Sequence, residues 1–280
     1  GWDQETVMPQ GSTVQRATEK AALVKTIHNR NTDPRIPEWI DKIRPQNEIE
    51  EANIRLIKKS YQKACKVPTD LNAEIARTTS KAHSIWASAR ENEDVAEYLP
   101  ILDEIISLKR QKAEALAETN TYYDALVDEY EPDMSTNDIS VMFEELRPTL
   151  VGLREKILGK NKIQSVTGKF DQNVQLSLAR ELAVTFGYNL NKGRIDLAVH
   201  PFSSGSGNDV RITTRTDQSD PFNCIYSTIH EVGHATYEQN INKDYDFTPL
   251  GRGVSLGVHE SQSRIFENQL GKSRAFTSWL

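Results

Sequence analysis

The sequence of 280 residues lacks several features that define large protein classes. It has two cysteines, Cys65 and Cys224, which lie far apart and form no C-x-x-C pair, so neither a disulfide framework nor a thiolate zinc site is encoded. No apolar run is longer than about five residues, whereas a membrane-spanning helix needs about 20. We therefore expect a chain that does not cross a membrane.

Charge of one sign is not concentrated anywhere along the chain. The 34 Lys and Arg residues are spread among 40 Asp and Glu residues, which gives a net charge of −6 and no basic stripe for binding nucleic acid. The chain begins at Gly1 without a signal peptide and ends at Leu280 in an uncapped apolar stretch. We expect an internal piece of a longer cytoplasmic protein.

Most of the chain has the apolar spacing of amphipathic helices. Between about residues 47 and 158, apolar side chains recur three and four positions apart. One such stripe consists of Leu71, Ile75, Thr79, Ala82 and Trp86. We interpret this stripe as a core face and the intervening Glu and Lys residues as solvated faces.

A different pattern occurs between residues 195 and 216. The segments 195–199 and 209–215 are short, β-branched and alternating, which predicts a hairpin whose connection, 203–208, is a flexible turn. Helices are expected at about 221–242 and 253–270. The predicted fold class is mainly α, with a small β-hairpin or sheet. We expect a helical region over 1–194 and a second region over 195–280, with short strands and two helices, as parts of one continuous domain truncated at its C-terminus.

An H-E-x-x-H motif is formed by His230, Glu231 and His234 within a predicted helix. Positions i and i+4 share a helix face, so both imidazoles can bind one zinc-like ion while Glu231 remains free to address a bound water. Gly233 lies inside this helix, where glycine costs roughly 1 kcal/mol relative to alanine. A closely packed neighbour or ligand would explain that glycine.

A catalytic zinc site needs a third protein ligand. Glu238 is unsuitable, because groups at spacings of 0, 4 and 8 lie in a line, and a third histidine six residues after the second is absent since position 240 is Asn240. Glu260 follows His234 by 260 − 234 = 26 residues, which leaves room for a loop and a returning helix. We favour Glu260 over the adjacent His259, because two histidines and one glutamate form an established catalytic zinc set.

Residues on the same predicted helix can orient these ligands. Ser263, Arg264 and Glu267 lie three, four and seven positions after Glu260, on the metal-facing side or its flank. The alternative for Arg264 and Glu267 is a surface ion pair that contributes little to stability.

Several blocks of the sequence together resemble the carboxypeptidase Taq family of thermostable metallocarboxypeptidases. Besides the H-E-x-x-H motif they are Trp2-Asp3-Gln4-Glu5-Thr6, Tyr123-Asp124-Ala125-Leu126, Tyr130-Glu131-Pro132, His200-Pro201-Phe202, Asp209-Val210-Arg211-Ile212-Thr213 and His259-Glu260-Ser261-Gln262-Ser263. The resemblance covers essentially the whole chain, although family members are roughly twice as long. The family's later G-x-x-Q block and a further C-terminal block have no counterpart before Leu280.

The resemblance implies a helical, cleft-bearing peptidase, commonly a homodimer, that removes single C-terminal residues from peptides with broad specificity. In such a peptidase, residues 1–194 would form one wall of the active-site cleft, and residues 195–280 would form the catalytic region, with the small sheet beside the cleft. It implies one zinc or cobalt ion per chain, bound by His230, His234 and Glu260, with Glu231 as the catalytic base. The alternatives are a helical metallo-oligoendopeptidase that uses the same zinc chemistry, and an inactive truncated scaffold.

An exopeptidase must also hold the free carboxylate of its substrate. Arg211 is our candidate, because Asp209, Arg211 and Thr213 alternate on one face of a predicted strand that can also pair with an extended substrate. A solvated edge strand is the alternative. His200 and His259 are further candidate substrate-binding residues.

Overall fold

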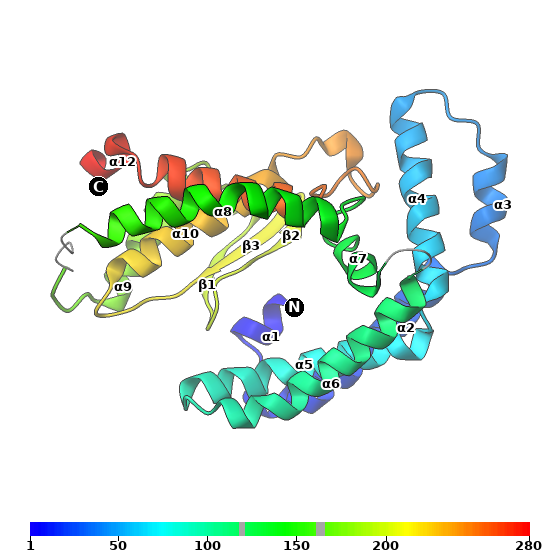
Figure 1. Ribbon diagram of the computed structural model, residues 1–280, viewed down its shortest axis with the longest axis horizontal. Coiled ribbons are helices and arrows are strands. Elements are labelled where there is room, and N and C mark those ends of the chain that lie inside the picture. The colour runs from blue at the N-terminus through cyan, green and yellow to red at the C-terminus, as the bar shows by residue number, and fades with distance from the viewer. Residues whose placement is uncertain (118–120, 161–165) are drawn as a thin grey trace. The chain divides into compact units, whose positions relative to one another are not determined.

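The computed structural model describes residues 1–117, 121–160 and 166–280, and divides the chain into two compact units (Figure 1). The first unit consists of 1–125 and 242–252, and the second of 126–241 and 253–280. This division differs from the expected boundary between residues 194 and 195. The helix α9 (Gln172–Thr185), expected in the N-terminal region, packs against the helix that carries the H-E-x-x-H motif.

The described part of the first unit is helical. Its elements are α1 (Trp2–Thr6), η1 (Gln10–Ser12), α2 (Thr13–Asn31), α3 (Arg35–Lys42), α4 (Glu48–Lys66), α5 (Thr69–Glu91), α6 (Val95–Leu116) and η3 (Lys243–Tyr245), and α7 (Tyr122–Val127) leads into the second unit. Helix α5 packs between α2 and α6. The mainly helical fold predicted from the periodicity is confirmed.

Small side chains form the contacts among these helices. The buried apolar residues of the three helices are Ala17, Ala21, Ala73, Ala82, Ala89, Ala113 and Leu116. Of the predicted stripe in α5, only Ala82 is buried, whereas Leu71, Ile75 and Trp86 are half-buried and Thr79 is exposed. Alanine allows helix backbones to approach closely, so the larger side chains lie at the rim of the contact.

The N-terminal block of the resemblance is attached to α5. The Gln4 amide donates to the backbone oxygen of Ser80 at 2.8 Å and accepts from the Ser80 hydroxyl at 3.1 Å. Gln4 also accepts a hydrogen bond from Lys20, and it is only 7% exposed. The block therefore has a structural role within the first unit.

The second unit combines helices with a small sheet. Its elements are α8 (Thr136–Leu158), α9, η2 (Leu190–Lys192), β1 (Ile195–Leu197), β2 (Ser203–Ser206), β3 (Asp209–Thr214), α10 (Pro221–Gln239), α11 (Leu256–Arg264), the π-helical segment η4 (Ile265–Leu270) and α12 (Arg274–Trp279). Among the described residues, no helix is long and apolar enough to span a membrane.

The sheet has the strand order β1-β3-β2, which corrects the predicted hairpin. β1 pairs with β3 in parallel, with Ile195 opposite Ile212. The expected turn instead contains β2, which pairs antiparallel with β3 and places Ser203 opposite Ile212. β3 is therefore the central strand and has partners on both edges, so it is not available to pair with an extended substrate.

The core of the second unit lies between this sheet and α10. Alternate residues of β3, Val210 and Ile212, are fully buried and cluster with Val232 and Ala235 of α10. A second cluster joins Ile225 and Ile229 of α10 with Leu182 of α9 and Phe276 of α12. Packing in these two clusters fixes the position of α10, which carries the two histidines.

Candidate metal centre

The two histidines of the H-E-x-x-H motif come from the middle of α10. This helix begins at Pro221, and the side chain of its N-cap residue Asp220 accepts a hydrogen bond from the Phe222 amide at 3.1 Å. The rings of His230 and His234 lie on one face with their centroids 4.9 Å apart. The spacing thus places both imidazoles side by side, as the helical periodicity requires.

Helix α11 brings Glu260 to the same place. Its first turn is capped by the Ser255 hydroxyl, which accepts from the Val258 amide at 3.2 Å. Two further bonds anchor this end of the helix: the Leu256 amide donates to the Tyr130 carbonyl at 2.8 Å, and the Gly257 amide donates to the Glu131 carboxylate at 2.8 Å. The Tyr130-Glu131-Pro132 block therefore anchors α11.

Gly233 is the point at which α10 and α11 touch. A Cβ atom at this position would lie 2.6 Å from the Cα atom of Ser263 and 2.9 Å from the carbonyl oxygen of Gln262. Ser263 is completely buried in this contact. The interpretation that a close neighbour explains this glycine is confirmed, and the neighbour is the backbone of the helix that carries Glu260.

The three predicted ligands have donor atoms within 4.8 Å of one another. Oε2 of Glu260 lies 3.6 Å from Nε2 of His230 and 3.3 Å from Nε2 of His234. Metal–ligand bonds of 2.0–2.1 Å in a tetrahedron separate ligand atoms by about 3.3 Å. The donor set and its spacing therefore fit a divalent metal ion with an open fourth position.

Glu267 and Arg264 surround the His230 side of this set. Nδ1 of His230 donates to Oε2 of Glu267 at 2.9 Å. Arg264 donates to Oε1 of Glu260 at 2.8 Å and to Oε2 of Glu267 at 3.0 Å, and Lys272 donates to Oε1 of Glu267 at 3.1 Å. Arg264 thus links the predicted ligand Glu260 to Glu267, which is the partner of the predicted ligand His230. This arrangement goes beyond a surface ion pair.

The charges around Glu267 keep it ionised. Burial alone would raise the pKa of its carboxyl, but the hydrogen bonds from His230 and Lys272, with the positive charges of Lys272 and Arg264, outweigh burial and lower that pKa. An ionised Glu267 accepts the Nδ1 proton of His230, which leaves the lone pair of His230 on Nε2, toward Glu260.

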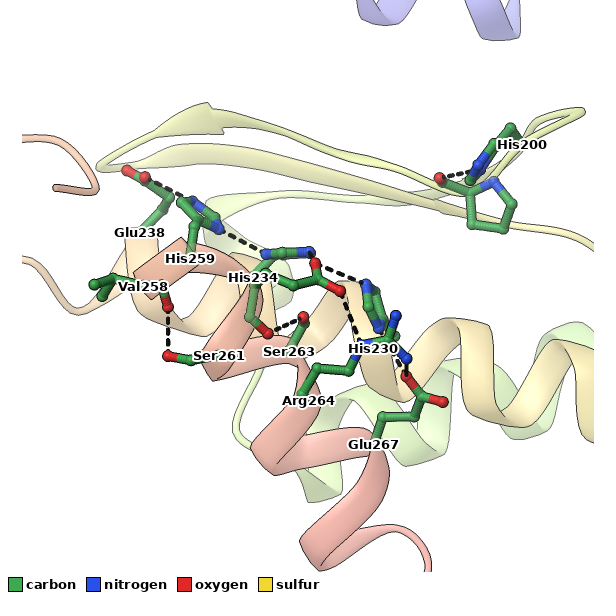
Figure 2. A network of polar contacts seen from close by, with 12 residues as sticks. His200, His230, His234, Glu238, Val258, His259, Ser261, Ser263, Arg264 and Glu267 are labelled. Atoms are coloured by element: carbon green, nitrogen blue, oxygen red, sulfur yellow. Dashed lines mark hydrogen bonds and ion pairs between the residues drawn. The ribbon is translucent and has the colours of Figure 1, made fainter. Parts of the chain in front are cut away.

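His234 has a different neighbour, His259, whose Nδ1 atom lies 2.6 Å from Nδ1 of His234 (Figure 2). Burial, followed by the repulsion that His259 and His230 exert when they are protonated, lowers the pKa of His234 to about 4. His234 is therefore neutral at physiological pH, which a metal-binding imidazole must be. His259 is also bonded to Glu238 of α10, with 3.0 Å between Nε2 and Oε1.

Glu231 is 5% exposed and lies close enough to Glu260 to be affected by its charge. Burial and the negative charge of Glu260 raise the pKa of its carboxyl to about 8. A carboxyl group in this condition can hold or release a proton near neutral pH, as a general acid or base must.

The other two candidates have hydrogen-bond partners outside the donor set. Arg211 forms a double hydrogen bond with Asp209, at 2.7 and 2.8 Å, and alternates along β3 with the residues that pack on α10. His200 donates from Nδ1 to the carbonyl oxygen of Pro201 at 2.8 Å and lies apart from the histidine cluster in Figure 2.

Glu131 and the role of Glu238 are the features of the site that the sequence did not identify. Both are acidic residues far from their partners in the sequence: Glu131 lies 126 residues before Gly257, and Glu238 lies 21 residues before His259. The Tyr130-Glu131-Pro132 block was a signal for the first. No spacing rule points to the second.

Comparisons with known proteins agree on one family. The family model described as Carboxypeptidase Taq (M32) metallopeptidase matches residues 1–280. Thermostable carboxypeptidase 1 of Thermus thermophilus is 40% identical over 98% of this chain and 58% of its own length. Thermostable carboxypeptidase 1 of Pyrococcus furiosus is 36% identical over 99% of this chain and 57% of its own length.

Solved structures give the same result. The crystal structure of an M32 carboxypeptidase from Deinococcus radiodurans matches with a TM-score of 0.86 and 34% identity, over 100% of this chain and 58% of that one. A structure titled BsuCP matches with a TM-score of 0.92 and 32% identity, over 97% of this chain and 56% of that one. The chain therefore spans less than two thirds of the length of the relatives it matches.

Proposed function

Because this chain belongs to the carboxypeptidase Taq (M32) metallopeptidase family, we propose that it is the metal-binding part of a carboxypeptidase that acts on peptides. The observation that carries the proposal is the convergence of two imidazole nitrogens and one carboxylate oxygen within 4.8 Å, beside the buried carboxyl of Glu231. Hydrolysis of a peptide bond is the chemistry that this arrangement supports best, and the family points to the terminal bond.

His230, His234 and Glu260 would hold one divalent ion per chain, zinc or cobalt. When bound, such an ion polarises the substrate carbonyl and lowers the pKa of a water molecule toward about 7. The bonds from Arg264 to Oε1 of Glu260 and from His230 to Glu267 leave Oε2 of Glu260 and Nε2 of His230 as the metal-binding atoms of these two residues. The side chains are thus oriented by their neighbours before an ion arrives.

Glu231 is the residue that moves the proton. Its carboxylate takes a proton from the attacking water, whose oxygen forms a bond to the carbon of the terminal peptide carbonyl. The carbon–nitrogen bond then breaks, and Glu231 returns the proton to the nitrogen of the leaving amino acid. In the metal-free chain, burial and the charge of Glu260 raise the pKa of this carboxyl to about 8, and the positive charge of a bound ion would favour its ionised, proton-accepting form.

The remaining parts of the proposal come from the family resemblance and from composition. They are broad specificity for the terminal residue, a homodimer and a cytoplasmic location. Roles for Arg211, His200 and His259 in substrate binding also stay predictions. The contacts of Arg211 with Asp209 mean that a substrate carboxylate would have to compete with an existing ion pair.

The test combines metal content with release of amino acids from an unblocked peptide. We expect about one metal ion per chain by plasma mass spectrometry and release that stops when a chelator is added. Glu231→Gln should lower turnover by roughly 10²–10⁴-fold while leaving metal content unchanged. Glu181→Gln, at an exposed position of α9, is the matched control and should change neither.

Two results would contradict the proposal. A metallo-oligoendopeptidase would still cut a peptide whose C-terminus is amidated, whereas a carboxypeptidase should not. An inactive scaffold would contain no stoichiometric metal and show no chelator-sensitive release, both in this chain and in a form extended to the length of its relatives.

A further inference from the structure

His259 lies between a predicted metal ligand and a buried carboxylate. Its Nδ1 atom is 2.6 Å from Nδ1 of His234, and its Nε2 atom is 3.0 Å from Oε1 of Glu238. Figure 2 shows the three side chains as one continuous row that begins on α10, passes through α11 and returns to α10. Such a row can transmit an effect from Glu238 to His234 without direct contact between them.

The hydrogen-bonding capacity of each group fixes the direction of this row. The ionised carboxylate of Glu238 only accepts, so Nε2 of His259 must carry a proton. A neutral His259 then has its lone pair on Nδ1 and accepts the proton that His234 carries on its own Nδ1. The lone pair of His234 is thereby placed on Nε2, the atom 3.3 Å from Oε2 of Glu260.

Glu238 is held in a buried position. Its side chain is 10% exposed, and Oε1 also accepts a hydrogen bond from the Gly253 amide at 3.1 Å. Among the described residues, Oε2 is buried and has no hydrogen-bond partner. Leaving a carboxylate oxygen in this condition costs free energy, so the position is unfavourable for Glu238 unless it serves another group.

Gly253 allows the row to form. A Cβ atom there would lie 2.7 Å from Cδ2 of His259 and 3.0 Å from Oε1 of Glu238. Because Gly253 has no side chain, the backbone can pass directly over the contact between His259 and Glu238. The loop closes over the pair and helps to exclude water from their hydrogen bond.

We propose that His259 and Glu238 are positioning residues that act through His234: they fix its tautomer and ring orientation so that Nε2 binds the metal ion. The inference rests on the proposed function, because it assumes that His234 binds a metal. This role differs from the substrate-binding role predicted for His259. Its contacts to His234 and Glu238 already use both ring nitrogens.

The experiment measures the dissociation constant of Co²⁺ by competition with a chelator, together with the visible absorption spectrum of the cobalt-loaded chain. His259→Leu removes both hydrogen bonds and should weaken cobalt binding by about 10–100-fold. His259→Gln offers a carbonyl oxygen to His234 and an amide N–H to Glu238, and should restore most of this loss. His83→Leu breaks a comparable contact, between His83 and Glu5 in the first unit, and should leave the constant unchanged.

Glu238→Gln provides an independent test that preserves side-chain volume. It removes the negative charge, so cobalt should bind several-fold more weakly and the absorption bands should shift, since the donor strength of His234 changes. Circular dichroism confirms that each variant is folded before the comparison is made.

Each outcome has one meaning. If the parent chain binds cobalt and His259→Leu binds it equally well, the positioning role is wrong and the metal site stands. If His259→Gln is as weak as His259→Leu while both are folded, the loss comes from packing and the role is again wrong. If the parent chain binds no metal, the proposed function fails and this inference fails with it.

Discussion

His230 is supported directly by a carboxylate that is bonded to two cations, whereas His234 is supported through a second imidazole by a buried carboxylate. On the first side, Glu267 contacts His230, Lys272 and Arg264, and the side chains of these two cations are about half exposed. On the second side, His259 separates His234 from Glu238, whose carboxylate has no cation partner among the described contacts.

The difference shows how one short motif acquires two kinds of support. The H-E-x-x-H spacing determines that the two imidazoles share a face, but it does not determine what binds their other nitrogens. Glu267, the partner of His230, comes from η4, and His259, the partner of His234, comes from α11. The first side ends in half-exposed cations, whereas the second ends in a buried carboxylate. We therefore expect substitutions on the two sides to respond differently to salt and to packing.

The largest effect is expected at Gly233, because both sides depend on the contact it allows. Gly233→Ala would place a methyl group 2.6 Å from the backbone of Ser263 and force α10 and α11 apart. We expect loss of measurable metal binding and a lower melting temperature, determined by titration and thermal unfolding.

Gly152→Ala is the matched control for this change. Gly152 lies inside α8, and a Cβ atom there meets nothing within 4 Å. Alanine should therefore stabilise the helix by about 0.5–1 kcal/mol without affecting the metal site. Equal behaviour of the two variants would contradict the packing argument.

The next effect concerns Glu231, which lies between the two histidines in sequence and belongs to neither side. Because its pKa in the folded chain is raised to about 8 from 4.5, the metal-free protein binds more protons when folded than when unfolded across this window. This contribution to stability is present below pH 4.5 and is lost as the pH rises toward 8.

Glu231→Gln isolates the contribution of Glu231 to the pH dependence of stability. At pH 8 the metal-free variant should be more stable than the parent, by on the order of a few kcal/mol, and the difference should vanish near pH 4. Denaturant unfolding of both proteins over this range measures it. A difference that does not change with pH would contradict the assignment, and the titration of His234 cancels because both proteins share it.

Substitutions at Glu267 separate the effect of its charge from the effect of its hydrogen bond to His230. Glu267→Leu removes the acceptor of the His230 proton and should weaken metal binding by about 10–100-fold, as measured by chelator competition. Glu267→Gln keeps an acceptor oxygen and removes only the charge, so its loss should be smaller. If the two variants lose the same amount, the charge of Glu267, and not its hydrogen bond, supports His230.

The smallest effect is expected at Lys272, on the exposed edge of the His230 side. Lys272→Met removes one ion pair from Glu267, which costs about 0–1 kcal/mol for exposed pairs and less at high salt. Metal affinity should change by less than about fivefold at low salt and hardly at all in 1 M salt. A large effect that persists at high salt would remove the contrast between the two sides.

The helical fold and the residues around the site were accessible to sequence reasoning because both depend on local spacing. The histidines at i and i+4, the glycine between them and Glu260 on a returning helix all follow from periodicity and from the ligand number of zinc. The structure brings the donor atoms of His230, His234 and Glu260 together.

Other features depend on contacts that no local pattern contains. Ser203–Ser206 has little β-propensity and forms a strand because β3 offers it an open edge, so the sequence indicated a turn instead. Leu71 and Trp86 dominate the periodicity of α5, yet alanines form its close contacts. The helical spacing argued only against Glu238 as a ligand, and its contact with His259 depends on how α10 and α11 are packed.

The bond between Glu131 and the Gly257 amide has a consequence for the order of folding. It joins residues 126 positions apart, and together with the bond from Leu256 to Tyr130 it fixes the start of α11. Loops of this length close slowly compared with the formation of a single helix. During synthesis, α11 emerges after α10 with its two histidines, so we expect the metal to be captured late, as one of the last events on the folding pathway.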